Sequence, residues 1–154
     1  MNQPTLTLTA GCGGAGKSTV MARMFPTLPV VDMDAIKEKL PGYDPLRPEL
    51  VHEQSAQLAM REFYARLGAG ESFAFDGSGK NVEKYIGLIN AARAAGFAVR
   101  IVWVRAPLAT CLARNAARPR KVPAAEITAA FHAVEAAQAV LKHYVDEHVV
   151  VDNS

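Results

Sequence analysis

The stretch GCGGAGKS at residues 11–18 decides the fold. It matches in full the pattern G-x-x-x-x-G-K-[ST], in which a glycine-rich loop joins a β-strand to an α-helix. Here TLTLTA (5–10) provides the strand and KSTVMARM (17–24) begins the helix. The glycines let the backbone turn several N–H groups toward an anion, and the helix N-terminus adds its positive end. The stretch therefore predicts a phosphate-binding loop (P-loop).

Individual residues of this loop have expected roles toward a nucleoside triphosphate. Lys17 would reach the β- and γ-phosphates, and the Ser18 hydroxyl would coordinate a Mg²⁺ ion that bridges the same phosphates. A glycine-rich turn that only joins strand to helix is the alternative, but such a turn has no need of Lys followed by Ser at the helix start. The loop residues expected to bind ATP are Gly11, Cys12, Gly13, Gly14, Ala15, Gly16, Lys17, Ser18 and Thr19.

Apolar runs and helix-forming segments alternate along the rest of the chain. Short connections between them predict right-handed crossovers and a mostly parallel sheet with helices on both faces. We expect one α/β domain over residues 1–154, a three-layer P-loop NTPase fold of the nucleoside-kinase type with a short lid at about 114–123. The expected five strands are 5–10, 29–32, 72–76, 98–104 and 148–152, and the expected helices are 16–24, 35–40, 48–67, 82–95, 108–117 and 124–145.

Charge and composition narrow the function classes. Lys and Arg number 17 and Asp and Glu 15, so the net charge of +2 is too weak to predict binding of long nucleic acid. The start has no signal-peptide pattern, and no apolar run approaches the ~20 residues of a membrane span, so we expect a cytoplasmic protein. Cys12 and Cys111 lack the spacing of a zinc site or redox motif, so neither a zinc site nor a disulfide is favoured.

Acidic residues follow the second expected strand in VVDMD (30–34). If the strand continues, its two-residue period points Asp32 and Asp34 to the same side, at the sheet edge beside the P-loop. An acceptor hydroxyl needs a carboxylate to orient it and take its proton, so we predict Asp34 as the general base. The alternative for Asp34 is that it only caps the following helix. Asp32 is expected to be a structural or metal-shell carboxylate rather than the base.

A further acidic strand end occurs in SFAFDGSGKN (72–81). Asp76 closes an apolar run as a Walker B acid would, so Asp76 and Ser18 are the predicted metal ligands. The small residues after it form a polar turn that can approach a ligand, and Ser78 is the predicted substrate contact. A plain turn that caps the next helix is the alternative.

Cations gather in LARNAARPRKVP (112–123). An ordinary run of this kind is a solvated surface. Beside a P-loop, however, guanidinium groups suit the negative charge that develops on a transferred phosphoryl group. We therefore predict that Arg114 and Arg120 are catalytic and that Arg118 binds ATP.

Together, GCGGAGKS, VVDMD, FDGSGK and RNAARPRKVP resemble the zeta toxin and polynucleotide kinase branch of P-loop kinases (AAA_33 type), over nearly the whole chain. The resemblance implies that Lys17 and Ser18 hold ATP and Mg²⁺ and that Asp34 is the base. It further implies that Lys37 and Glu62 stand at substrate-binding positions, Ser78 contacts substrate, and Arg114 and Arg120 clamp the transition state. Zeta toxins phosphorylate a UDP-linked amino sugar, and an antitoxin protein is the implied partner.

These features predict an ATP-dependent kinase that transfers the γ-phosphate to a hydroxyl of a small molecule or nucleotide sugar. A 5′-hydroxyl polynucleotide kinase is one alternative, although Lys37 replaces the arginine that follows the base in that enzyme. Chloramphenicol phosphotransferases share the same outline. A non-catalytic regulator that binds ATP is the alternative from another class.

Overall fold

The computed structural model describes residues 3–119 and 122–154, and within them it contains a five-stranded sheet of order β2-β3-β1-β4-β5. All pairings between neighbouring strands are parallel. The prediction of a mostly parallel sheet is therefore confirmed. The strands are β1 (Thr5–Ala10), β2 (Val30–Asp32), β3 (Phe73–Asp76), β4 (Ala98–Arg105) and β5 (Glu147–Asp152).

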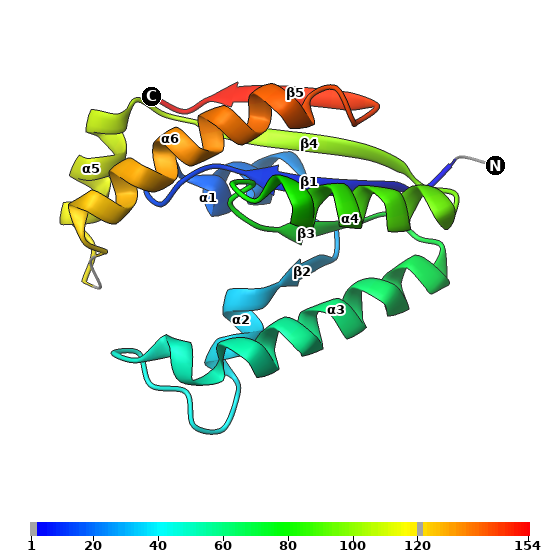
Figure 1. The fold of residues 1–154 in the computed structure, drawn as a ribbon, viewed down its shortest axis with the longest axis horizontal. Coiled ribbons are helices and arrows are strands. Elements are labelled where there is room, and N and C mark those ends of the chain that lie inside the picture. The colour runs from blue at the N-terminus through cyan, green and yellow to red at the C-terminus, as the bar shows by residue number, and fades with distance from the viewer. Residues whose placement is uncertain (1–2, 120–121) are drawn as a thin grey trace.

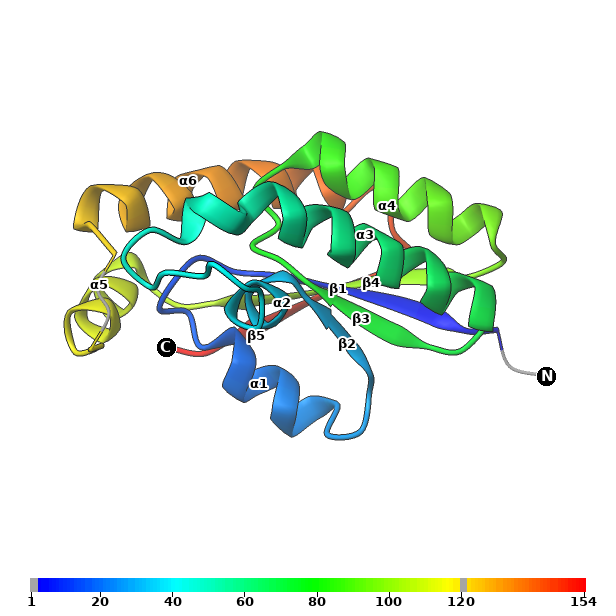
Figure 2. The same cartoon turned by 90° about the horizontal axis from the view of Figure 1, so that it is seen from below.

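Helices cover both faces of the sheet, as the predicted three-layer fold requires. Figure 2 shows α3, α4 and α6 side by side on one face and α1 on the other. In Figure 1, α5 lies beyond the carboxyl ends of the strands, near the C-terminus. The helices are α1 (Lys17–Met24), α2 (Met33–Glu38), α3 (His52–Ala69), α4 (Val82–Ala94), α5 (Leu108–Ala116) and α6 (Ala124–Leu141), with a 3₁₀ helix η1 (Pro48–Val51) before α3.

The central strand β1 is buried on both faces, in keeping with its place between two helix layers. Leu6 and Leu8 join the apolar cluster under α3, α4 and α6. Thr7 and Thr9 alternate with these leucines and are 0% and 1% exposed. Both threonine hydroxyls are hydrogen-bonded, Thr7 to the Arg100 guanidinium and Thr9 to the end of β3, so burial leaves neither unsatisfied.

Three predicted helix boundaries are wrong for identifiable reasons. The helix predicted at 35–40 begins at Met33, because the Asp32 carboxylate caps it from the end of β2. The helix predicted at 48–67 begins as the 3₁₀ turn η1, with Pro48 at its first position, and then continues to Ala69. The helix predicted at 124–145 ends at Leu141, because Asp146 is already bonded to Val99 of β4.

Candidate active site

A cleft of about 720 Å³ opens at the carboxyl end of the sheet. The P-loop forms one wall, and the start of α2 and the turn after β3 form others. Asp34, Asp76, Ser78 and Arg118 all line it, although they come from three separate stretches of the sequence. The fold therefore brings the P-loop, both acidic strand ends and part of the cationic segment to one place.

The P-loop conformation depends on its glycines, as Gly14 and Gly16 illustrate. Gly14 and Gly16 have φ of 86° and 87°, in the left-handed region that side chains rarely adopt. A Cβ at Gly14 would lie 2.5 Å from the carbonyl oxygen of Cys111 in α5. In the described part of the chain no side chain caps α1, so its first-turn N–H groups remain available to an anion.

Lys17 and Asp76 both line the cleft, and Lys17 acts electrostatically on the Asp76 carboxylate. The Lys17 ammonium donates a hydrogen bond to the Gly77 carbonyl oxygen at 3.0 Å. The Asp76 carboxylate accepts one from the Thr9 hydroxyl at 3.0 Å. Burial raises the pKa of Asp76 and outweighs the lowering effect of Lys17 and Thr9, while Asp32 and Asp34 add a smaller rise. A cation bound here would therefore relieve an unfavourable buried charge.

Asp32 and Asp76 are partners in the parallel register of β2 and β3. The strand stops at Asp32, whose carboxylate accepts hydrogen bonds from the Asp34 and Ala35 N–H groups at 3.0 and 3.1 Å. The prediction that a continuing strand aligns Asp32 with Asp34 is therefore wrong, and so is the alternative in which Asp34 is the cap. Asp34 lies in the first turn of α2, is exposed, and still lines the cleft.

The turn after β3 is fixed by hydrogen bonds from three directions. The Gly77 N–H donates to the Thr9 hydroxyl, the Gly11 N–H donates to the Ser78 carbonyl, and the Gln138 side chain donates to the Gly79 carbonyl, each at 2.9 Å. Asn81, not Ser78, caps α4 by accepting from the Lys84 N–H. The alternative in which Ser78 caps the next helix is therefore wrong, and Ser78 lines the cleft.

A second pocket of about 300 Å³ adjoins the cleft, and Asp34 and Arg118 line both. Lys37 lies one helical turn after Asp34 and reaches the His52 ring nitrogen Nδ1 at 3.2 Å. Glu62 lines neither space. It lies along α3 and faces Arg66 at 3.7 Å.

The predicted arginines occupy different places. Arg114 does not line the cleft; its guanidinium donates to the carbonyls of Gly14 and Ala15 at 3.2 Å and to that of Asn153 at 2.8 Å. It therefore braces the P-loop. Arg118 is exposed and lines the cleft. Arg120 lies outside the described residues.

Several residues that support the site are not predicted by the sequence patterns. Tyr85 is fully buried and donates to the Thr9 carbonyl at 2.6 Å, and burial raises the pKa of its hydroxyl. Asn153 donates to the Ala15 carbonyl from a position 138 residues away in the sequence. Only Thr9 carries a local signal, a polar residue at the end of a buried strand. The other contacts are long-range and follow only from the tertiary structure.

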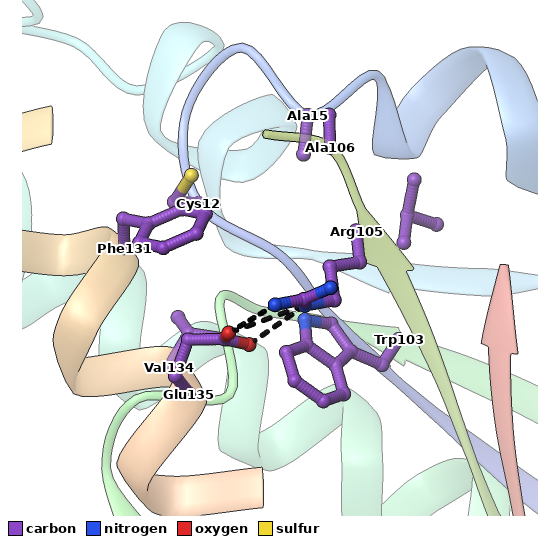
Figure 3. Close-up of a pocket in the computed structure, with 9 residues that line it drawn as sticks. Cys12, Ala15, Trp103, Arg105, Ala106, Phe131, Val134 and Glu135 are labelled. Carbon is purple, nitrogen blue, oxygen red and sulfur yellow. Dashed lines mark hydrogen bonds and ion pairs between the residues drawn. The ribbon is translucent and has the colours of Figure 1, made fainter. Parts of the chain in front are cut away.

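A small separate cavity lies behind the P-loop, between β4 and α6 (Figure 3). Its volume is about 10 Å³, room for a single water molecule, and it contains the bidentate ion pair of Arg105 with Glu135. Cys12 and Cys111 are both buried nearby, with their sulfur atoms 3.5 Å apart. This cavity is too small to bind a nucleotide.

The oxygen donors in the cleft suit Mg²⁺. Asp76, Asp32 and the Ser18 hydroxyl all line it, and hard oxygen ligands are those that Mg²⁺ prefers. No group of three or more His, Cys, Asp or Glu able to hold a metal occurs among the residues described. Magnesium in phosphate sites is commonly held by one or two carboxylates together with the phosphates, so the donors present fit that mode.

Known structures with the same fold include kinases and a toxin–antitoxin system. The PezAT chromosomal toxin–antitoxin system of Streptococcus pneumoniae matches with a TM-score of 0.79 and 15% identity, covering 99% of this chain and 70% of that one. A gluconokinase from Sinorhizobium meliloti 1021 matches with a TM-score of 0.61 and 15% identity, covering 99% and 84%. The structure of AvrRxo1-ORF1 and ORF2 with ATP matches with a TM-score of 0.66 and 22% identity, covering 92% of this chain and 50% of that one.

These similarities establish a P-loop kinase-like fold for the described chain. No curated protein matches the sequence. Within the described residues, none of the helices combines the length and apolarity needed to cross a bilayer. The family model for the AAA domain (AAA_33) matches residues 6–144, which confirms the resemblance seen in the sequence. The chain belongs to this AAA domain family of P-loop proteins.

Proposed function

We propose that the protein is an ATP-dependent phosphotransferase that moves the γ-phosphoryl group of ATP to a hydroxyl of a small molecule or nucleotide sugar. The observation that carries this proposal is the position of Asp34, which lines both the P-loop cleft and the adjoining pocket. A carboxylate between a phosphate site and a second pocket is placed to act on an acceptor hydroxyl.

The phosphate groups of ATP would be held by the P-loop N–H groups, the N-terminus of α1 and Lys17. Ser18 and Asp76 would hold Mg²⁺, which supplies positive charge to neutralise the phosphate oxygens. Lys17 already lies beside Asp76 and the turn after β3, so the cation and the metal-binding carboxylate share the cleft floor.

Asp34 suits the role of base better than Asp76. Asp76 is half-buried, accepts a hydrogen bond from Thr9 and has a raised pKa. Asp34 is exposed, and its carboxylate has no hydrogen-bond or ion-pair partner in the described part of the chain. A free carboxylate can accept a hydroxyl proton without breaking an existing contact.

In the proposed reaction the acceptor oxygen attacks the γ-phosphorus while its proton passes to Asp34. The bond between the γ-phosphorus and the β–γ bridging oxygen breaks, and ADP leaves with that oxygen. Arg118 lines the cleft and the adjoining pocket, so its guanidinium is placed to meet charge on the transferred group. Arg114 would act through the P-loop that it braces.

A protein partner is a further part of the proposal. The PezAT system is a toxin–antitoxin system, and this similarity supports an antitoxin partner for the present chain. Co-purification with the product of a neighbouring small reading frame, followed by inhibition of phosphate transfer, would test it.

Incubation of the purified protein with γ-labelled ATP and a metabolite extract tests the phosphotransferase. We expect label to move to a small molecule in the presence of Mg²⁺, and not with Asp34→Asn. Transfer to a short 5′-hydroxyl oligonucleotide, with steep salt dependence, would instead identify a polynucleotide kinase. ATP binding without transfer to any acceptor would identify a non-catalytic regulator.

A further inference from the structure

We propose that the acceptor is a small hydroxy acid whose anionic group binds Lys37 and Arg118 while its reacting hydroxyl meets Asp34. This inference rests on the proposed function and specifies its substrate class. The site is the pocket of about 300 Å³ beside the cleft, with walls that include Asp34, Lys37, Glu38 and Tyr43.

The size of the pocket favours a small acceptor. Its volume of about 300 Å³ is less than half that of the adjoining cleft, about 720 Å³. A sugar acid or a cyclic hydroxy acid fits this space, whereas a nucleotide sugar would have to extend beyond it.

The two cations of the pocket, Lys37 and Arg118, suit an anionic group. The Lys37 ammonium lies 3.2 Å from the His52 ring nitrogen Nδ1, and no carboxylate lies within ion-pair distance of Lys37 or Arg118 among the residues described. Both cations line the pocket without a counter-charge in ion-pair contact. A carboxylate on the acceptor would supply the missing partner through charge-assisted hydrogen bonds.

The acidic side chains favour an acceptor that also carries several hydroxyls. Asp34 and Glu38 line the same pocket and are exposed. Carboxylates accept hydrogen bonds and donate none, so they match hydroxyl groups. With two cations and two carboxylates around one small space, the matching molecule carries both an anionic group and hydroxyl groups.

Equilibrium binding separates this inference from the reaction. In the presence of Mg²⁺ and a non-hydrolysable ATP analogue, sugar acids and cyclic hydroxy acids are titrated beside their uncharged alcohol counterparts. We expect the acids to bind at least about tenfold more tightly, as one charged hydrogen bond provides. Equal binding of acids and alcohols, or tighter binding of UDP-linked sugars, would overturn the inference.

The matched variants are Lys37→Gln and Lys39→Gln. Both lysines belong to the same short segment, but only Lys37 lines the pocket. Lys37→Gln should weaken binding of the acid, and raise its KM, about tenfold to a hundredfold, with little change for the uncharged alcohol or in ATP affinity. Lys39→Gln should leave all of these at wild-type values. An unchanged affinity for the acid in Lys37→Gln would contradict the assignment.

Different results would contradict the phosphotransferase and the hydroxy-acid acceptor. If the protein phosphorylates a neutral alcohol or a nucleotide sugar and Lys37→Gln has no effect, the phosphotransferase stands and the hydroxy-acid inference falls. If hydroxy acids bind and depend on Lys37 but no label is transferred from ATP, the binding site stands and the phosphotransferase falls.

Discussion

The ammonium group of Lys17 donates a hydrogen bond to the carbonyl oxygen of Gly77, which joins the P-loop to the turn after β3 across 60 residues of sequence. The same lysine lowers the pKa of Asp76 against the stronger effect of burial. Lys17 therefore links the loop predicted to hold phosphate with the carboxylate predicted to hold Mg²⁺.

Replacing Lys17 with Met tests this link. Loss of the charge should lower ATP affinity by at least about tenfold and reduce phosphate transfer further, because the cation would contact both ground-state and transferring phosphates. Calorimetric titration with ATP and Mg²⁺, together with the label-transfer assay, measures both effects. Lys39→Met, outside the cleft, is the control; wild-type affinity and rate in Lys17→Met would rule out the P-loop assignment.

Replacing Asp34 with Asn separates chemistry from binding. Asparagine keeps the size of the side chain but does not take up the hydroxyl proton, so transfer should fall about 10²- to 10⁴-fold while the ATP Kd changes little. The control is Glu71→Gln, an exposed acid in the α3–β3 connection at the opposite edge of the sheet. Near-normal transfer by Asp34→Asn would show that another group is the base.

The positions of these residues were predictable to different degrees. The P-loop and the acidic strand ends follow from local sequence patterns. The P-loop is a glycine-rich stretch between a strand and a helix, and each acid follows an apolar run. The path of the chain after Asp32 was not predictable from alternation alone. The Asp32 carboxylate accepts hydrogen bonds from two N–H groups, so the strand ends there and α2 begins. The two-residue alternation of a strand does not reveal such a cap.

The bracing contacts were hidden from the sequence for another reason. The cationic segment predicts that Arg114 meets the transition state, and in the structure its guanidinium donates to the carbonyls of Gly14, Ala15 and Asn153. The resemblance implies a substrate-binding position for Glu62, but the Glu62 side chain lies along α3 and faces Arg66. Such assignments need the rotation of each helix, which sequence spacing fixes only approximately.

Asp76 gives a pH-dependent prediction for stability without metal. Because burial raises the folded-state pKa of Asp76 above its usual value of 3.8, the folded protein retains this proton to higher pH than the unfolded chain does. The contribution of Asp76 to stability is thus highest below pH 3.8 and declines as pH rises through that folded-state pKa. Asp76→Asn should therefore be more stable than wild type at neutral pH in chelator, with the difference shrinking in acid.

Denaturant unfolding of wild type and Asp76→Asn over a range of pH measures this difference. Adding Mg²⁺ with ATP should stabilise the wild type more than the variant, because the ion would pair with the carboxylate. A variant that is less stable than wild type at neutral pH in chelator would show that Asp76 is not an unfavourable buried charge.

Gln138 of α6 should hold the turn after β3 in position. Its side chain is 1% exposed, donates to the Gly79 carbonyl and contacts the His148 ring nitrogen at 2.9 Å. Gln138→Met keeps the length but leaves both partners unpaired, so the free energy of unfolding should fall by about 1–3 kcal/mol. Because Ser78 belongs to the same turn, the acceptor KM should rise more than the ATP Kd. Gln57→Met, on the exposed side of α3, is the control, and unchanged stability and KM in Gln138→Met would refute the role.

Arg114 and Arg118 should respond differently to the same substitution. The Arg114 guanidinium spans three carbonyl oxygens, two in the P-loop and one at Asn153, and a lysine ammonium cannot span the same set. Arg114→Lys should therefore lower both stability and ATP affinity. Arg118 is exposed and lines the cleft and the acceptor pocket, so Arg118→Lys should leave stability unchanged while it reduces the rate of transfer and raises the KM of the acceptor. If Arg114→Lys instead lowers kcat alone, with ATP Kd and unfolding unchanged, Arg114 acts on the transferred phosphoryl group directly.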